Sequence, residues 1–374
     1  MQGIGIIGCG NISAAYLRLA PLFKGLEVRA VADMNAESAK ARAQEFNVRA
    51  ETVEGLLSAD DIDIIVNLTI PDAHFSVTRD ILRAGKHAYT EKPIVLTLEQ
   101  GEELRALAAE NNLRIGSAPD TFLGGAHQAA RAAIDAGQIG KVIAGTAHVM
   151  SHGMEHWHPN PDFFFLPGAG PMLDIGPYYV TNLIQLLGPV KRVSALTSMA
   201  SDTRTILSEP RKGEVIPVKT PTNIHALLDF HSGATITLST SWDVWAHRHG
   251  HMELYGADGT MFLPDPNWFS GTVEITNAEG ETRTLDTDSH PLGIPNQDNH
   301  GEAKANYRTA GLAEMAIAMN EGRPHRCALE LAIHAVDVMT SVLKAGEQGE
   351  VITLSTTCER PAPLPADLAA DLLK

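Results

Sequence analysis

The sequence lacks the features that mark secreted, membrane-spanning and nucleic-acid-binding proteins. Its three cysteines, Cys9, Cys327 and Cys358, are far apart and odd in number, which favours a reducing compartment over a disulfide framework. No apolar run approaches the roughly 18 residues that a membrane-spanning helix needs, and no basic leader of a signal peptide precedes the first apolar run. The formal net charge of -16, with no stretch dense in lysine and arginine, argues against nucleic acid and anionic membranes as partners. These absences predict a soluble cytoplasmic protein.

The composition that remains is that of an ordinary globular protein. Hydrophobic residues make up 44% and charged residues 20% of 374 positions, a length that favours two domains. Through the first 120 residues, short apolar runs alternate with Ala-, Leu- and Glu-rich segments of helical spacing, which indicates βαβ units and a parallel sheet. The expected strands are residues 3–8, 26–32, 62–68, 87–90 and 113–118, and the expected helices are residues 14–22, 36–46, 73–84 and 98–111.

The pattern changes after about residue 124. Longer strand-like runs follow, and turn sequences such as H-S-G-A and G-A-D-G between them favour hairpins and an antiparallel sheet. The fold class is therefore predicted as α/β, with a doubly wound parallel sheet over 1–122 and an α+β domain with a mostly antiparallel sheet over 123–374. The later strands are expected at residues 142–150, 190–198, 224–230, 235–244, 251–255 and 272–276, the helices at 126–136, 173–187, 309–319 and 329–344, long loops at 201–221 and 286–306, and an extended tail at 361–365.

A glycine-containing turn, G-C-G-N-I-S, follows the first expected strand. Gly8 permits a tight turn, and Gly10 lets the backbone approach a pyrophosphate at the start of the helix that Asn11 and Ile12 open. Asp33 closes the second strand, where the ribose-binding acid of a dinucleotide site belongs. A plain strand–helix turn with a capping acid is the alternative. Because a carboxylate at this position repels a 2′-phosphate, NAD is expected in preference to NADP.

A second contact with the cofactor is expected in T-I-P-D-A-H, which contains Thr69, Pro71 and His74. This segment leaves the third parallel strand at its carboxyl end, the edge at which open α/β sheets bind ligands. The same letters also make an ordinary helix start, and both interpretations can hold.

Two further motifs carry candidate catalytic groups. In E-K-P, Glu91 and Lys92 follow the fourth strand at the same edge, so the lysine either is a solvated surface charge or projects toward the nicotinamide to stabilise an alkoxide. Asp174 and Tyr178 are four residues apart and would share one face of a helix, where they could hydrogen-bond a polyol. Taken alone, this pair fits a capping acid and a packed aromatic better.

Together, the Gly8–Ser13 turn, Asp33, E-K-P and D-I-G-P-Y resemble the glucose–fructose oxidoreductase/inositol dehydrogenase/MocA (Gfo/Idh/MocA) family, in the family's order over nearly the whole chain. The resemblance implies a Rossmann domain, a C-terminal open-faced sheet that mediates assembly into dimers or tetramers, and NAD(P)-dependent chemistry on sugars and polyols. It implies that Lys92 is the active-site lysine, that Asp174 binds substrate, and that Tyr178 stands where many members have a catalytic histidine. It also makes Lys92–Pro93 a candidate cis peptide bond.

One segment departs from the family pattern. Many members carry an Asn-Arg-Arg-Phe-like run after the fifth strand, whereas this chain has Pro-Asp-Thr-Phe, with Asp120 and Thr121 as candidate substrate-binding residues. The loss of two cations there disfavours a phosphorylated or strongly acidic substrate.

Histidines gather in two places. His156 and His158 flank Trp157, and this segment is expected to cover the nicotinamide cleft and bind a sugar. The second group, at 247–251, fits an interface or a solvated strand better. Without a cysteine or an H-E-x-x-H pair to support either cluster, no metal is expected.

The leading hypothesis is an NAD-dependent dehydrogenase of a sugar or polyol, with a neutral aldose favoured. Tyr178, or a water that it holds, would act as the base, Lys92 would support it, and Asp174 would orient the substrate and the lysine. Two alternatives stay open: an NAD-retaining non-redox enzyme of the glycosidase or isomerase type, and a non-catalytic NAD-sensing regulator on the same fold.

Overall fold

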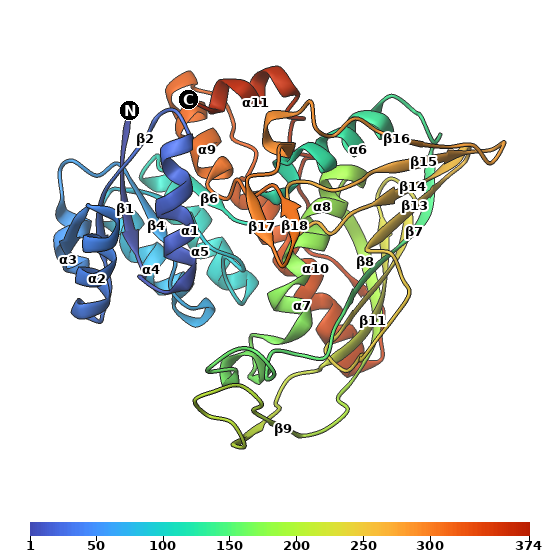
Figure 1. Ribbon diagram of the computed structural model, residues 1–374, viewed down its shortest axis with the longest axis horizontal. Helices are drawn as coiled ribbons and strands as arrows, with labels where there is room; N and C mark the ends of the chain where they lie inside the picture. The colour runs from blue at the N-terminus through green and yellow to red at the C-terminus, as the bar shows by residue number, and fades with distance from the viewer.

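The N-terminal part of the chain forms a parallel sheet of six strands in the order β3-β2-β1-β4-β5-β6 (Figure 1). The computed structural model describes residues 1–374. The central strands are buried on both faces, as a doubly wound sheet requires, and the strand order reverses between β1 and β4, which opens a crevice at their carboxyl ends. The elements are β1 (Gln2–Ile7), α1 (Asn11–Leu19), β2 (Leu26–Ala32), α2 (Ala36–Phe46), β3 (Arg49–Glu51), α3 (Val53–Ser58), β4 (Ile64–Asn67), α4 (Pro71–Arg83), β5 (His87–Thr90), α5 (Leu98–Glu110) and β6 (Ile115–Ser117).

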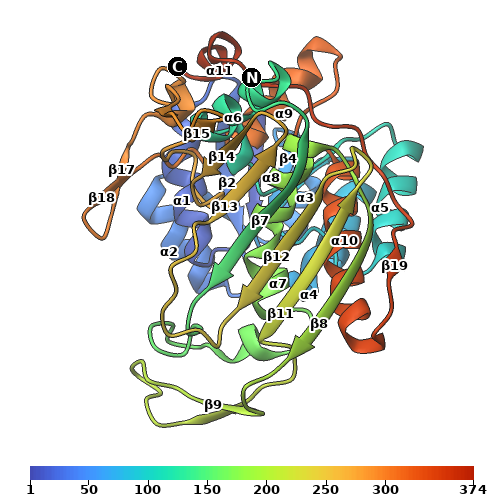
Figure 2. The same ribbon diagram turned by 90° about the vertical axis from the view of Figure 1, so that its right-hand side faces the viewer.

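The C-terminal part is built on a nine-stranded sheet in the order β16-β15-β14-β13-β7-β12-β11-β8-β19. All neighbours are antiparallel except β12 and β7, which pair in parallel. Helices cover one face only, and Figure 2 shows the other face of β7, β12, β11 and β8 without a helix in front of it. The strands are β7 (Val142–Met150), β8 (Val190–Ser198), β11 (Asn223–Phe230), β12 (Thr235–Ser241), β13 (Met252–Gly256), β14 (Gly259–Leu263), β15 (Glu274–Asn277), β16 (Thr282–Thr284) and β19 (Ile352–Thr353).

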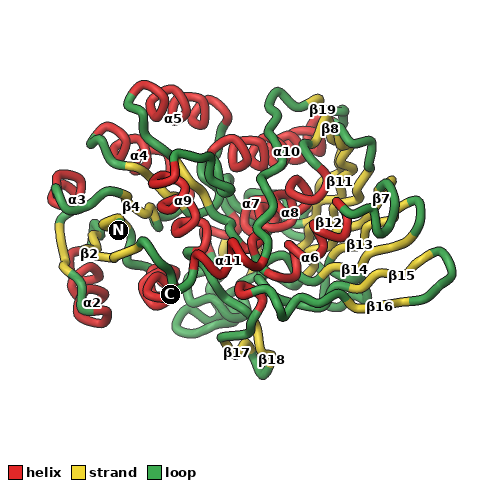
Figure 3. Tube along the Cα trace, turned by 90° about the horizontal axis from the view of Figure 1, so that it is seen from above, coloured by secondary structure: helices red, strands yellow, loops and turns green.

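Seen from above, α8 and α10 lie between the two sheets (Figure 3). The predicted fold class, including the open-faced sheet, is confirmed. The remaining helices are α6 (Gly125–Asp135), α7 (Gly170–Asp174), α8 (Gly176–Leu187), α9 (Ala310–Glu321), α10 (Leu329–Gln348) and α11 (Ala366–Leu372). None of them combines the length and the hydropathy that a membrane crossing demands.

Three predictions about local structure were wrong. The expected loop at 201–221 contains a hairpin of β9 (Thr203–Thr205) and β10 (Val215–Pro217), and the one at 286–306 contains β17 (Gln297–Asn299) and β18 (Glu302–Lys304). The expected helix 173–187 is interrupted at Ile175, because Pro177 starts a new helix and has no N–H to continue the old one. Asp174 and Tyr178 therefore lie on different helices rather than on one face of the same helix.

Residues 151–169 and 199–222 form what we call the small lobe, which lies near β9 at the bottom of Figure 1. The apolar cluster that supports it is separate from the main core and consists of Phe165, Ile206, Ile216 and Val218 of the lobe together with Trp242, which follows β12. Arg204 bridges Glu155 of the lobe and Asp243, which follows β12. The lobe is thus an additional layer fastened to one end of the sheet.

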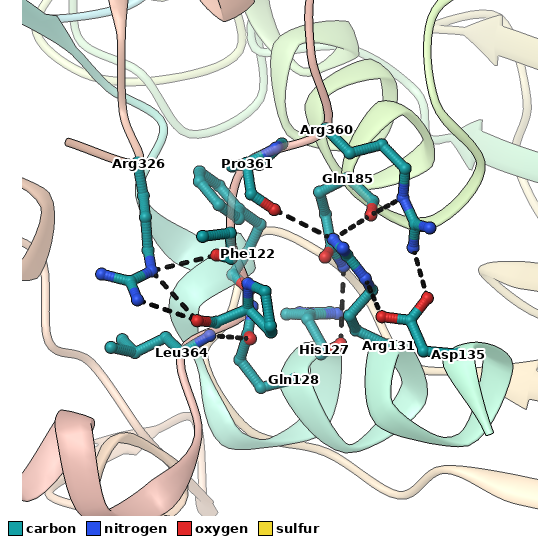
Figure 4. Close-up of polar contacts among 12 residues, drawn as sticks. Phe122, His127, Gln128, Arg131, Asp135, Gln185, Arg326, Arg360, Pro361 and Leu364 are labelled. Carbon is teal, nitrogen blue, oxygen red and sulfur yellow. Dashed lines mark hydrogen bonds and ion pairs between the residues drawn. The ribbon is translucent and has the colours of Figure 1, made fainter. Parts of the chain in front are cut away.

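The expected tail at 361–365 is extended, but it is held in place by side chains (Figure 4). Arg131 donates to the carbonyl oxygen of Pro361 at 3.1 Å, Arg326 donates to those of the next two residues, and the N–H of Leu364 donates to Gln128 Oε1 at 2.7 Å. The chain then returns to the parallel-sheet domain through α11. The proposed division at 122/123 stays a prediction, since this last segment crosses it.

Candidate functional site

The glycine turn has the shape of a dinucleotide cradle. Gly8 has φ +103°, and a Cβ there would lie 2.6 Å from the carbonyl oxygen of Leu68, so only glycine fits. A Cβ at Gly10 would meet nothing within 4 Å, which leaves open space beside the turn, and α1 begins at the next residue, Asn11. The residues present therefore fit a pyrophosphate at the helix start.

Asp33 is held at the end of β2 in a position to bind a ribose. One of its carboxylate oxygens accepts the N–H of Cys9 at 2.7 Å, and the other accepts the N–H of Asn35 at 2.8 Å. The side chain is only partly buried, so the remaining lone pairs can accept hydroxyl groups. The turn and this acid together fit the adenosine half of NAD.

A cavity of about 280 Å³ lies beside this crevice and brings together the predicted catalytic residues and several of the predicted cofactor contacts. The predicted residues that line it are Ile12, Thr69, Pro71, His74, Glu91, Lys92, Asp174 and Tyr178. Six further residues complete the wall: Pro93, Phe163, Phe164, Gly168, Ala169 and Leu173.

Lys92 is the centre of this constellation. Its Nζ donates to the carbonyl oxygen of Asp174 at 2.5 Å and to Asp174 Oδ1 at 3.0 Å, and it lies 5.2 Å from the centroid of the Tyr178 ring. Burial opposes the charge, but Asp174, Tyr178 and Glu91 together more than offset burial and raise the pKa of Lys92 above its ordinary value. The lysine is therefore a fixed cation. The Lys92–Pro93 bond is cis, as the resemblance implied.

The helix interruption explains why Asp174 can hold the lysine twice. In an unbroken helix the N–H of Tyr178 would bond the carbonyl oxygen of Asp174, whereas here it bonds that of Ile175 at 3.1 Å. The carbonyl oxygen of Asp174 is left for Lys92. The break that contradicts the sequence prediction thus creates a bidentate acceptor for the lysine.

Glu91 and His74 shape the turn from beneath. Glu91 accepts the hydroxyl of Tyr16 at 2.9 Å and the N–H of Lys92 at 3.0 Å. His74 is buried, with Nδ1 2.6 Å from the carbonyl oxygen of Pro93 and Nε2 3.0 Å from that of Thr69. Burial lowers the pKa of His74. Glu91 and His74 therefore stabilise the two loops, after β4 and after β5, in which the cofactor contacts were predicted.

The five residues that were predicted only as substrate ligands lie outside the cavity. Asp120 and Thr121 are buried, and Asp120 accepts the backbone N–H groups of Thr309 and Gly311 at 3.0 and 2.9 Å, so it anchors a C-terminal segment. Burial raises the pKa of Asp120 to about 6. The other three are His156 and Trp157, which are exposed, and His158, which is partly buried.

Sequence reasoning missed two aromatic residues of the cavity wall. Phe163 and Phe164 line the cavity with ring centroids 4.0 Å apart, and the ring of His158 packs edge-on against both of them from behind. The D-F-F-F run at 162–165, close to Trp157, was the available signal.

A partly buried cation was missed as well. The guanidinium of Arg308 lies 5.9 Å from the centroid of the Tyr178 ring. Its segment is irregular and far away in sequence, and it carries no pattern that points to the site.

The histidine groups form no metal-binding cluster. His148 and His249 stack with centroids 4.1 Å apart, and His249 lies 6.2 Å from His247. No three His, Cys, Asp or Glu side chains are grouped so that they could hold a metal ion.

Comparisons with known proteins agree with this geometry. Residues 2–118 match the model of an oxidoreductase family with an NAD-binding Rossmann fold, and residues 127–262 match the GFO/IDH/MocA C-terminal domain. The 1,5-anhydro-D-fructose reductase of Ensifer adhaerens is 25% identical over 366 residues, 95% of this chain and 99% of that protein. An uncharacterized oxidoreductase of Schizosaccharomyces pombe is 30% identical over 200 residues, 51% of this chain and 53% of that protein.

Solved structures share the fold over the whole length. Levoglucosan dehydrogenase in complex with NADH and L-sorbose superposes with a TM-score of 0.79 at 18% identity, covering 95% of this chain and 99% of that one. An NAD-binding oxidoreductase from Klebsiella pneumoniae gives a TM-score of 0.81 at 19% identity, with 95% and 99% covered. The chain therefore belongs to the Gfo/Idh/MocA family of oxidoreductases and binds NAD on its Rossmann domain.

Proposed function

We propose that the protein is an NAD-dependent dehydrogenase of a neutral sugar or polyol, with a neutral aldose as the favoured substrate. The observation that carries this proposal is the partly buried Lys92–Asp174 pair beside Tyr178, at the ligand-binding edge of the parallel sheet. Relatives named for reactions of anhydrofructose and levoglucosan support the same substrate class.

The side chains divide the chemistry between them. Bound NAD supplies the hydride acceptor. Tyr178 takes the proton of the substrate hydroxyl, for which a free tyrosine, with a pKa of about 10, needs cationic help. Lys92 gives that help by favouring both the phenolate and the developing alkoxide, and Asp174 orients the lysine and the substrate.

The cavity wall supports a neutral, partly apolar substrate. The rings of Phe163 and Phe164 offer a surface for the C–H face of a sugar, as the apolar linings of ligand sites commonly do. Lys92 is the only lysine or arginine among the lining residues, and it is already paired with Asp174. Nothing in the wall is therefore free to neutralise a substrate phosphate or carboxylate.

The test compares two lysines that flank the same strand. Wild-type enzyme is screened with neutral aldoses, inositols and sugar acids by NADH absorbance, and a product formed without NADH would indicate a non-redox enzyme instead. Lys92→Met should lower turnover by about 10² to 10⁴ and leave the Kd for NAD within a few-fold. Lys86→Met, which alters a lysine at the opposite end of β5, should be active. Wild-type turnover in Lys92→Met would end the proposal.

We infer further that the chain forms homo-oligomers, dimers or tetramers, through the uncovered sheet face. Leu196 of β8 and Leu227 of β11 are 75% and 49% exposed there. Large apolar side chains that share an exposed face are typical of a protein–protein interface. Light scattering should give a multiple of the chain mass, reduced to one chain by Leu196→Asp with Leu227→Asp. A monomeric wild type would refute this.

We also propose a cytoplasmic location, which suits the three free cysteines and is tested by cell fractionation.

A further inference from the structure

Arg308 is a nearly enclosed cation with a fixed position beside the proposed base. Its Nη2 donates to Asn267 Oδ1 at 2.7 Å and to the carbonyl oxygen of Asn267 at 3.1 Å, while Nη1 donates to Asn306 Oδ1 at 3.2 Å. The guanidinium carbon lies 5.9 Å from the ring centroids of both Tyr178 and Trp268. The group is therefore held between two aromatic rings by three oxygen atoms.

The charge of Arg308 is not cancelled by an ion pair. All three of its acceptors are neutral amide or carbonyl oxygens, and no carboxylate lies within ion-pair distance of it. Lys92, by contrast, bonds directly to the Asp174 carboxylate. Of the two cations near Tyr178, Arg308 is thus the one that no carboxylate bonds directly, while Asp120 and Glu91 act on its charge from a greater distance.

The segment that carries Arg308 contains a strained backbone conformation that its surroundings hold in place. The next residue, Thr309, is buried with φ +98°, which β-branched residues avoid, and its hydroxyl has no hydrogen-bond partner. Asp120 holds this backbone through the N–H groups of Thr309 and Gly311. Such strained positions persist only where their surroundings hold them, and they gather at functional sites. Asp120, expected to bind substrate, instead anchors the segment that presents Arg308.

We propose that Arg308 is a positioning residue for hydride transfer, whose guanidinium stabilises the phenolate form in which Tyr178 accepts the substrate proton. The inference rests on the proposed function, in which Tyr178 is the base. In that step the substrate O–H bond breaks and its proton joins the phenolate oxygen, while the C–H bond breaks and its electron pair leaves with the hydride for bound NAD. The phenolate must exist before the transfer, and a cation 5.9 Å from the centroid of its ring favours it.

The experiment measures the pH dependence of kcat/KM for sugar oxidation. In Arg308→Met the rising limb should move to higher pH by about 1 to 2 units, a ten- to hundredfold loss on that limb, with the Kd for NAD unchanged. Arg308→Lys should keep most of the wild-type profile. The control is Arg114→Met, which removes a partly buried arginine that donates to a single carbonyl oxygen in the other domain. An unmoved limb in Arg308→Met, or an equal shift in Arg114→Met, overturns the inference.

A second readout needs no substrate. The ultraviolet absorption of the Tyr178 phenolate is identified as the part of the signal that is missing in Tyr178→Phe. In Arg308→Met this absorption should appear at higher pH than in wild type. If Arg308→Met fails to fold, Asn267→Ala takes its place: it removes one acceptor of the Arg308 guanidinium and leaves the arginine itself in the protein. This variant must give a smaller shift in the same direction, and an unchanged phenolate titration in it counts against the inference. If Tyr178→Phe keeps wild-type turnover, the proposed function fails. If it is inactive while the Arg308→Met profile is unmoved, only the role of Arg308 fails.

Discussion

Replacing Arg204 with methionine should detach the small lobe without unfolding the rest of the molecule. Nη1 of Arg204 lies 2.9 Å from Glu155 Oε1 and Nη2 bonds Asp243, with the three side chains 9%, 4% and 13% exposed. The variant leaves two nearly buried carboxylates without their cation, which costs about 3–5 kcal/mol when one partner of a buried pair is removed. Since four of the five residues in the separate apolar cluster belong to the lobe, this loss should fall mainly on the lobe.

The assay is hydrogen exchange resolved by segment, together with steady-state kinetics. In Arg204→Met, amides at 151–169 and 199–222 should exchange faster while those of β11 and β12 stay protected. KM for the sugar should rise, because Phe163 and Phe164 lose their support, and the Kd for NAD should not change.

Arg211→Met is the matched control, since this lobe arginine pairs with exposed carboxylates and such pairs contribute little. Adding Glu155→Gln and Asp243→Asn to Arg204→Met should restore part of the protection, because no buried charge is then left unpaired. Wild-type exchange and KM in Arg204→Met, or an equal effect in Arg211→Met, would refute the reasoning.

Two predictions concern buried titratable groups and use denaturant unfolding. Burial raises the pKa of Asp120 to about 6, so its contribution to stability falls as the pH rises from about 4 to 6. At pH 8 Asp120→Asn should therefore be at least as stable as wild type. Asp120→Ala leaves the N–H groups of Thr309 and Gly311 without an acceptor and should lower the free energy of unfolding by about 2 kcal/mol or more. Burial also lowers the pKa of His127 to about 4, so below pH 6.5 the unfolded chain binds a proton at this histidine that the folded protein does not, and stability falls as the pH falls toward 4. Between pH 6.5 and 5 wild type should lose about 2 kcal/mol more than His127→Gln, and equal losses would contradict this.

The parts of the site that could be predicted are those determined by local sequence. The glycine turn, Asp33 and E-K-P each follow a strand whose apolar run is plain, and their common edge follows from the parallel order of those strands. The location of Lys92 directly after the fourth expected strand was therefore enough to predict that it lies at the cofactor crevice.

The parts that could not be predicted depend on contacts between distant segments. The strands β9 and β10 have three residues each and no periodicity, and they are held by the ion pairs of Arg204 rather than by their own propensity. Arg308 reaches Tyr178 only because Asp120, in the other domain, fixes its backbone. For the same reason nothing in the sequence indicated that Asp120 anchors the backbone of Thr309 and Gly311.

The return of α11 to the parallel-sheet domain has a consequence for synthesis on the ribosome. Residues 372–374 pair with the backbone of residues 22–24, where Phe23 is fully buried. The last strand of the sheet, β6, leaves the ribosome about 250 residues before α11 begins, which is roughly 10 to 50 seconds at 5–20 residues per second. For that time the nascent Rossmann domain exposes an apolar surface around Phe23, and this is where a chaperone would be expected to bind it.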